Sequence, residues 1–88
     1  MSRANKKSII EYQGQEIPIT ITYDGIRSKL NQYNELVMYR EVRGKIVSSQ
    51  TFVLDTIVIL DGNEMKIIYY NNNVRPADIS LTDNVIGL

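Results

Sequence analysis

The sequence contains no cysteine and no histidine, and only two prolines among its 88 residues. Without cysteine, neither a disulfide nor a thiolate metal site can stabilise the fold. Without histidine, the chain lacks the usual general base and the commonest imidazole metal ligand. We therefore expect a protein that is not an enzyme, that uses no metal or cofactor, and that gains stability by forming a homo-oligomer.

Long hydrophobic runs and an excess of one charge are also missing. No segment approaches the ~18 apolar residues of a membrane span, and the basic start leads into no signal core, so we expect a cytoplasmic protein. The net charge is zero, which argues against binding duplex DNA. The charge is nevertheless uneven, +3 over residues 1–45 and −3 over residues 46–88. Either the ends of a dipolar molecule attract neighbouring subunits, or these are ordinary solvated faces.

The length predicts one domain, with residues 1–7 as a flexible N-terminus and residues 8–88 as a single β-rich unit. Apolar and polar residues alternate from Ile17 to Tyr23, which predicts a half-buried strand. A short apolar segment, Ser8 to Tyr12, precedes it across a Gly14 turn. Together these residues predict a hairpin over residues 8–23.

A different spacing follows this hairpin. Ile26, Leu30, Tyr33 and Val37 recur at intervals of four, three and four residues, which predicts a short α-helix over residues 25–38. Asp24 suits the N-cap of that helix. Its end stays open, because the apolar residues from Leu36 onward equally suit the start of a strand.

The second half of the chain predicts one strand after another. Residues 36–47 suit one or two strands, in which Gly44 marks a bend or bulge. Residues 57–60 are apolar on both faces and suit a central strand. The other expected elements are strands at 52–54, 65–70 and 74–81, a turn at 61–64, and a tail at 85–88 that covers a sheet edge. The predicted fold is mainly β, a small antiparallel sheet or barrel with one helix.

Candidate binding residues gather near the end of the strand at 65–70. Tyr69 and Tyr70 point to opposite faces, so one of them is expected to be exposed beside Arg75 and the asparagines 71–73. An exposed tyrosine there suits base stacking or a protein contact. The alternative is that the asparagines only form a turn.

Two motifs carry a resemblance to a known family. Arg40-Glu-Val-Arg-Gly-Lys-Ile-Val-Ser and Val74-Arg-Pro-Ala-Asp-Ile79 lie within a segment, residues 35–81, that resembles the Sm-like (LSm) family of SH3-type barrels. That family assembles into rings and commonly binds RNA. The resemblance implies that Phe52 stacks on a base and that Arg75 helps to hold it. Pro76 stands where the family has glycine.

Three functions remain open after these observations. The first is a non-enzymatic binding or assembly module that forms homo-oligomers. The second is a protein that binds single-stranded nucleic acid. Its tentative ligand residues are Arg40, Arg43, Lys45, Phe52, Tyr70, Asn72, Asn73 and Arg75. The third is a phage or mobile-element protein that sequesters a host protein or a signalling nucleotide, which the isoleucine- and asparagine-rich, alanine-poor composition suits.

Overall fold

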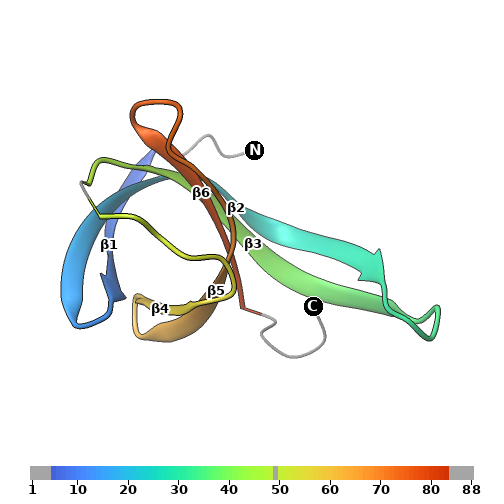
Figure 1. Cartoon of the computed structure of the whole chain (residues 1–88). Coiled ribbons are helices and arrows are strands. Elements are labelled where there is room, and N and C mark those ends of the chain that lie inside the picture. The colour runs from blue at the N-terminus through green and yellow to red at the C-terminus, as the bar shows by residue number, and fades with distance from the viewer. Residues whose placement is uncertain (1–4, 49, 84–88) are drawn as a thin grey trace.

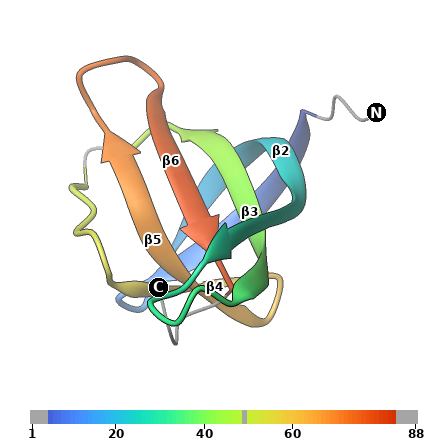
Figure 2. The ribbon, with the colours of Figure 1, turned by 90° about the vertical axis from the view of Figure 1, so that its right-hand side faces the viewer.

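Six strands and no helix make up the regular structure of residues 5–48 and 50–83, which the computed structural model describes. They are β1 (Lys6–Tyr12), β2 (Gln15–Leu30), β3 (Leu36–Ile46), β4 (Ile57–Leu60), β5 (Asn63–Asn71) and β6 (Ala77–Thr82). The strands pair antiparallel in the order β1-β2-β3-β6-β5-β4, and β4 returns to β1, so that the sheet closes into a barrel (Figure 1). Figure 2 shows β5, β6 and β3 side by side. The predicted antiparallel β fold is thereby confirmed.

Strand alternation fills the barrel with apolar side chains. Ile17, Ile19 and Ile21 of β2 all point inward and are buried, as their spacing predicted. At one end of the core the ring of Phe52 lies between those of Tyr12 and Tyr70, with centroids 4.7 and 5.3 Å apart. The other buried apolar residues are Ile10, Val42, Ile46, Val58, Leu60, Met65, Ile67, Ala77, Ile79 and Leu81.

Several predicted boundaries agree with the structure. The hairpin over residues 8–23 is present, although β1 starts at Lys6 and so includes two residues expected to be loose. Asp61 and Gly62 form the β4–β5 turn with φ angles of 52° and 82°. β4 pairs on both sides, as expected of a central strand. Residues 52–54 form no strand, and the predicted tail at 85–88 lies outside the described residues.

The predicted helix over residues 25–38 is wrong, because these residues form the outer part of a long β2–β3 hairpin. β1 pairs with β2 only as far as Ile21, and β6 pairs with β3 only as far as Glu41. Residues 22–40 therefore leave the barrel as a two-stranded ribbon, which we call the arm (Figure 1). Ile26 and Leu30 are four residues apart, and this spacing fits one face of a strand as well as a helix.

A compact turn at the tip of the arm makes residues 25–38 a hairpin instead of a helix. The side-chain Oδ1 of Asn31 accepts hydrogen bonds from the backbone N–H groups of Tyr33, at 2.8 Å, and Glu35, at 3.0 Å. Asn34 takes a φ of 60°, and its N–H donates to the carbonyl of Asn31. Asparagine is suited to both tasks, since its side chain mimics a turn and tolerates left-handed backbone. These local bonds reverse the chain where a helix would have continued.

The predicted irregularity at Gly44 is present, because the register shift falls between the pairs Ile21↔Gly44 and Tyr23↔Arg43. The register shift lies on the opposite strand, between Ile21 and Tyr23 of β2. At Gly44 itself the strands approach closely: a Cβ there would lie 2.8 Å from the carbonyl oxygen of Thr20 and 2.9 Å from the side chain of Ile19. Because Gly44 has no side chain, β3 can approach β2 this closely.

We expect Gly44→Ala to lower the free energy of unfolding by about 1–3 kcal/mol, because a backbone oxygen would have to move. Gly25→Ala in the same hairpin is the matched control. A Cβ at Gly25 would meet only the far end of the Tyr23 side chain, which can swing away. Urea denaturation should show a change of less than about 1 kcal/mol for this control. Equal losses in the two variants would contradict the close-approach explanation.

Candidate functional site

A cavity of about 760 Å³ opens at one end of the barrel, between the segment after β3 and the β5–β6 loop. We call it the loop-end cavity. Val47, Val74 and the Tyr70 side chain supply apolar surface, while Asn72 and Arg75 supply hydrogen-bond donors. Among the described residues that line it, Arg75 alone is charged, and no described carboxylate lies within 4 Å of its guanidinium. The cavity therefore suits a ligand that carries negative charge and some apolar surface.

Three of the predicted site residues meet in this cavity: Tyr70, Asn72 and Arg75. The Tyr70 hydroxyl donates to the carbonyl of Gln50 at 3.4 Å, which connects β5 to the segment after β3. Asn73 belongs to the same loop but does not line the cavity, and its N–H donates to the side chain of Asn71. The loop thus combines turn geometry with side chains that line a cavity.

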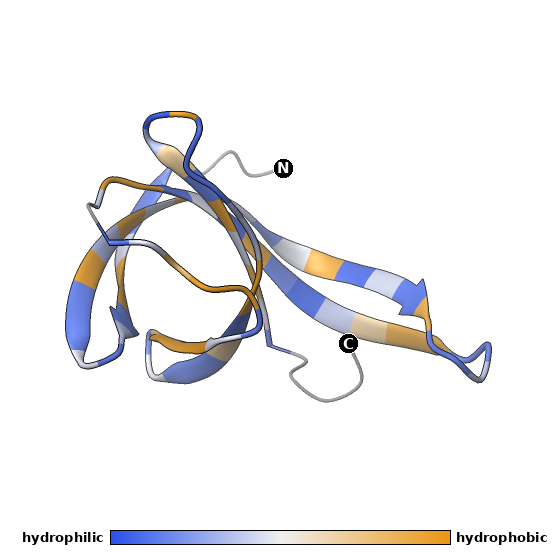
Figure 3. Cartoon of the chain, viewed as in Figure 1, coloured by the Kyte–Doolittle hydropathy of each residue, from blue (hydrophilic) through white to orange (hydrophobic). Residues whose placement is uncertain are grey.

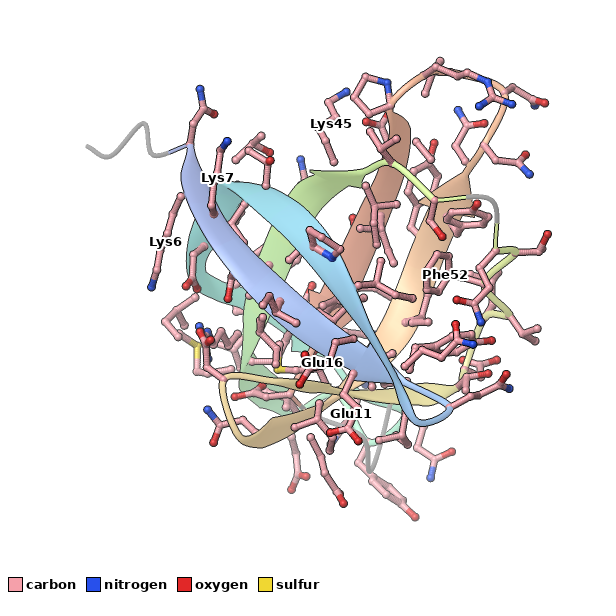
Figure 4. The ribbon with its side chains drawn as sticks, turned by 90° about the vertical axis from the view of Figure 1, so that its left-hand side faces the viewer. Lys6, Lys7, Glu11, Glu16, Lys45 and Phe52 are labelled. Carbon is pink, nitrogen blue, oxygen red and sulfur yellow. The ribbon has the colours of Figure 1, made fainter. Side chains whose placement is uncertain are left out.

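Phe52 lies in the core instead of on the surface. Only 4% of the residue is exposed, and it packs against Tyr12 and Tyr70 (Figure 4). In this conformation its ring is not available to stack on a base, so the role implied by the family resemblance does not fit the structure. The ring instead supports Tyr70 from beneath the cavity.

Arg43 and Lys45 lie on the outer surface of β3, beside a second hollow of about 530 Å³. Both are engaged in ion pairs, Lys45 with Asp78 and Arg43 with Glu41 at 2.8 Å. The Glu41 side chain is 8% exposed and also pairs with Arg27 at 3.1 Å. Glu41 raises the pKa of Arg27 above its usual value. Arg27 and Arg43 thereby stabilise a buried carboxylate, whereas Lys45 is engaged with a partly exposed one.

Arg40 lies at the base of the arm, apart from both hollows. Its guanidinium donates to both carboxylate oxygens of Asp24, at 2.9 and 2.8 Å, and its backbone N–H donates to Asp83 at 3.0 Å. The hydrogen bonds from Arg40 lower the pKa of Asp24, and the same contact raises the pKa of Arg40. The predicted ligand residues are therefore divided among four places: the loop-end cavity with its loop, the core, the outer surface of β3 and the base of the arm.

The arm also carries an exposed apolar surface that was not predicted from the sequence. The cross-strand pairs Ile26↔Arg40, Ser28↔Met38 and Leu30↔Leu36 place alternate residues on one face. We call the four large members of this set, which are 59–66% exposed, the apolar arm face: Ile26, Leu30, Leu36 and Met38. By strand register they continue the inward side of β2 and β3 beyond the end of the barrel. Figure 3 shows apolar residues on both strands of the arm. Their alternation around an Asn31–Asn34 turn was the signal that could have revealed them.

Comparisons with protein-family models, with curated proteins and with solved structures find no match to this chain. Within residues 5–48 and 50–83, no group of three or more carboxylates is arranged to hold a metal ion. The same residues form no helix of the length and hydropathy needed to cross a membrane. The candidate sites therefore rest on geometry alone.

The Asp24–Arg40 pair gives a prediction about pH. We expect Asp24→Asn to lower the free energy of unfolding at pH 7 by less than about 1 kcal/mol, because the Asp24 side chain is 41% exposed. Since the folded-state pKa of Asp24 is lowered, the contribution is present at neutral pH. It disappears as the pH falls from about 4 through that lowered pKa.

Denaturation curves of both proteins from pH 7 to pH 2 test this expectation. The difference in the free energy of unfolding between the wild type and Asp24→Asn should narrow below about pH 4. Glu64→Gln serves as the control, because Glu64 is exposed and has no ion-pair partner among the described residues. A difference that stays constant down to pH 2 would argue against the ion pair as its cause.

Proposed function

We propose that this chain is a non-enzymatic assembly module whose copies join through the apolar arm face. The observation that carries the proposal is the set of four large aliphatic side chains on one side of a projecting ribbon, each more than half exposed. An exposed apolar patch of this kind marks an interaction surface more often than an ordinary monomer surface. The absence of histidine and cysteine supports a role in binding instead of catalysis.

The charges around the apolar arm face favour a second copy as the occupant. Asp24 and Arg40, at the base of the arm, pair with each other, so this face offers no free charge to a charged partner. The same face of another copy has the same length and the same apolar character, and a two-fold axis places the two in contact. The arm also projects beyond the barrel, which leaves room for the approach (Figure 1). Two ribbons packed face to face would lie about 10 Å apart.

A pair of neighbouring substitutions tests the proposal. Leu36 belongs to the apolar arm face, whereas Val37 pairs with Lys29 on the opposite face of the arm. We expect Leu36→Glu to give a smaller species than the wild type in size-exclusion chromatography with light scattering. Association should weaken at least tenfold, because a charge replaces a side chain worth about 1.5–3 kcal/mol when buried. Val37→Glu should leave the mass unchanged.

Circular dichroism of both variants establishes that the fold is retained. A wild-type protein that stays monomeric at about 100 μM would contradict assembly, since that concentration detects even contacts worth about 5–6 kcal/mol. Equal masses for the wild type and Leu36→Glu would contradict the role of the arm.

Single-stranded RNA binding at the loop-end cavity is a second candidate function. What supports it is the meeting of Tyr70, Asn72 and Arg75, an arginine with no ion-pair partner within residues 5–48 and 50–83. A stacking ring, an amide and a guanidinium are the groups that commonly bind unpaired bases and phosphates. The closed antiparallel sheet agrees with the Sm-like resemblance only in being a small β fold. That the barrel is of the SH3 type is part of this proposal.

For this candidate we expect Arg75→Ala to weaken binding of a uridine-rich oligonucleotide by about tenfold at ~50 mM salt, and to lower the salt dependence by about one phosphate contact. Lys29→Ala removes an exposed cation from the arm and serves as the control. Fluorescence anisotropy measures both. Absence of binding by the wild type, or equal losses in the two variants, would exclude nucleic acid at this cavity.

A further inference from the structure

The outer face of β1, β2 and the end of β3 carries three rows of side chains with different character. Strand pairing places Lys7 opposite Thr20, and Thr20 opposite Lys45, which forms a basic row. The next outward pair, Ile9↔Pro18, is apolar, and the third, Glu11↔Glu16, is acidic. We call this surface the three-row face. Figure 4 shows it with Lys7 and Lys45 toward one end and Glu11 and Glu16 toward the other.

The acidic row is unfavourable within a single chain. Glu11 and Glu16 are exposed and directly opposite each other on neighbouring strands. Like charges at directly opposed positions destabilise a sheet. No described cation lies within ion-pair distance of either carboxylate. Two adjacent negative charges without a partner would gain from a cation brought by another molecule.

The opposite end of the face supplies such cations. Lys7 is exposed and pairs with no described carboxylate, while Lys45 forms an ion pair with Asp78. Lys7 and Glu11 are four residues apart on one strand, which corresponds to about 13 Å. One chain therefore holds an unpaired cation, Lys7, and two unpaired carboxylates at a fixed separation on the same surface, among the residues that the structure describes.

Apolar residues fill the space between the two charged rows. Ile9 is 51% exposed, and Pro18 beside it is exposed as well. Val47 is 78% exposed and lines a hollow together with Pro18 and Glu16. An apolar strip flanked by charges has the composition of a protein interface, with a dry centre and a polar rim.

We infer that the three-row face binds a second copy of this chain. The two-fold axis that relates the two copies lies in the plane of the interface and runs along the Ile9–Pro18 row. Such an axis reverses the order of the rows, so that Lys7 and Lys45 of one copy face Glu11 and Glu16 of the other. The apolar rows then meet at the centre. Because both copies have the same spacing between rows, the charges of both ends are matched at once.

Self-association explains the arrangement better than a differently charged partner does. A uniformly acidic partner would match the basic row and oppose Glu11 and Glu16, and a uniformly basic partner would do the reverse. Only a surface with the same rows in reversed order satisfies both ends. A second copy provides that surface without any further assumption.

This contact is independent of the apolar arm face, since it lies on the outer surface of β1 and β2. A chain with two separate self-complementary faces assembles beyond a dimer, whereas Leu36→Glu would leave a dimer held by the three-row face alone. The Leu36→Glu protein is therefore the background for the test. In it, failure of this inference can be distinguished from failure of the arm proposal.

Charge exchange between two variants provides the experiment. Lys7→Glu with Lys45→Glu makes the face acidic at both ends, and Glu11→Lys with Glu16→Lys makes it basic at both ends. In the Leu36→Glu background, we expect each variant alone to associate more than tenfold more weakly than its parent. An equimolar mixture should recover the dimer, since opposite charges then meet in every row. Light scattering in about 50 mM salt measures the masses, and added salt should dissociate the mixed dimer.

Three outcomes would overturn the inference. The first is a monomeric Leu36→Glu parent at about 100 μM, which would mean that the charged rows are an ordinary solvated surface. The second is a dimer that both charge variants retain. The third is a mixture that fails to reassociate although circular dichroism shows both variants folded. If the Leu36→Glu parent is a dimer and the wild type has the same mass, only the arm proposal is contradicted.

Discussion

The structure depends on the long antiparallel pairing of β2 with β3. Register runs from Ile19↔Ile46 in the core to Leu30↔Leu36 at the tip of the arm, with one shift between Ile21 and Tyr23. The inner part of β2 also pairs with β1, and the inner part of β3 pairs with β6, which builds most of the barrel. The outer parts pair only with each other. One hairpin therefore provides the core wall, the apolar arm face and part of the three-row face.

Charged residues on this protein fall into two groups, those paired within the chain and those without a described partner. Glu41 is enclosed by two arginines, and Asp24 is held by Arg40, so these charges are matched within the chain. Glu11, Glu16, Lys7 and Arg75 have no such partner among the described residues. Matched pairs fix the geometry of the hairpin, whereas unmatched charges lie where another molecule can approach.

Sequence patterns predicted the barrel strands well and the arm poorly. Ile17 to Ile21 alternate, and Asp61-Gly62 is a strong turn signal, so each local preference agreed with the tertiary structure. At residues 25–38 the spacing of Ile26 and Leu30 satisfied helix and strand alike, and the Asn31 turn decided between them. Among the candidate ligand residues, Tyr70, Asn72 and Arg75 came together because they flank one loop. Arg40 and Lys45 formed ion pairs with residues far away in the chain, Asp24 and Asp78, which no local pattern identifies.

The sequence by itself determined the β class, the inward-facing residues of the barrel strands and the absence of histidine and cysteine chemistry. These properties depend on residue type and on short-range alternation, which act within a few residues. Tertiary structure alone decided that Phe52 is buried, that the apolar residues of the arm remain uncovered, and that Glu11 lies opposite Glu16. Each of these depends on which segments pair across the sheet, and strand register is set by contacts between residues far apart in the chain.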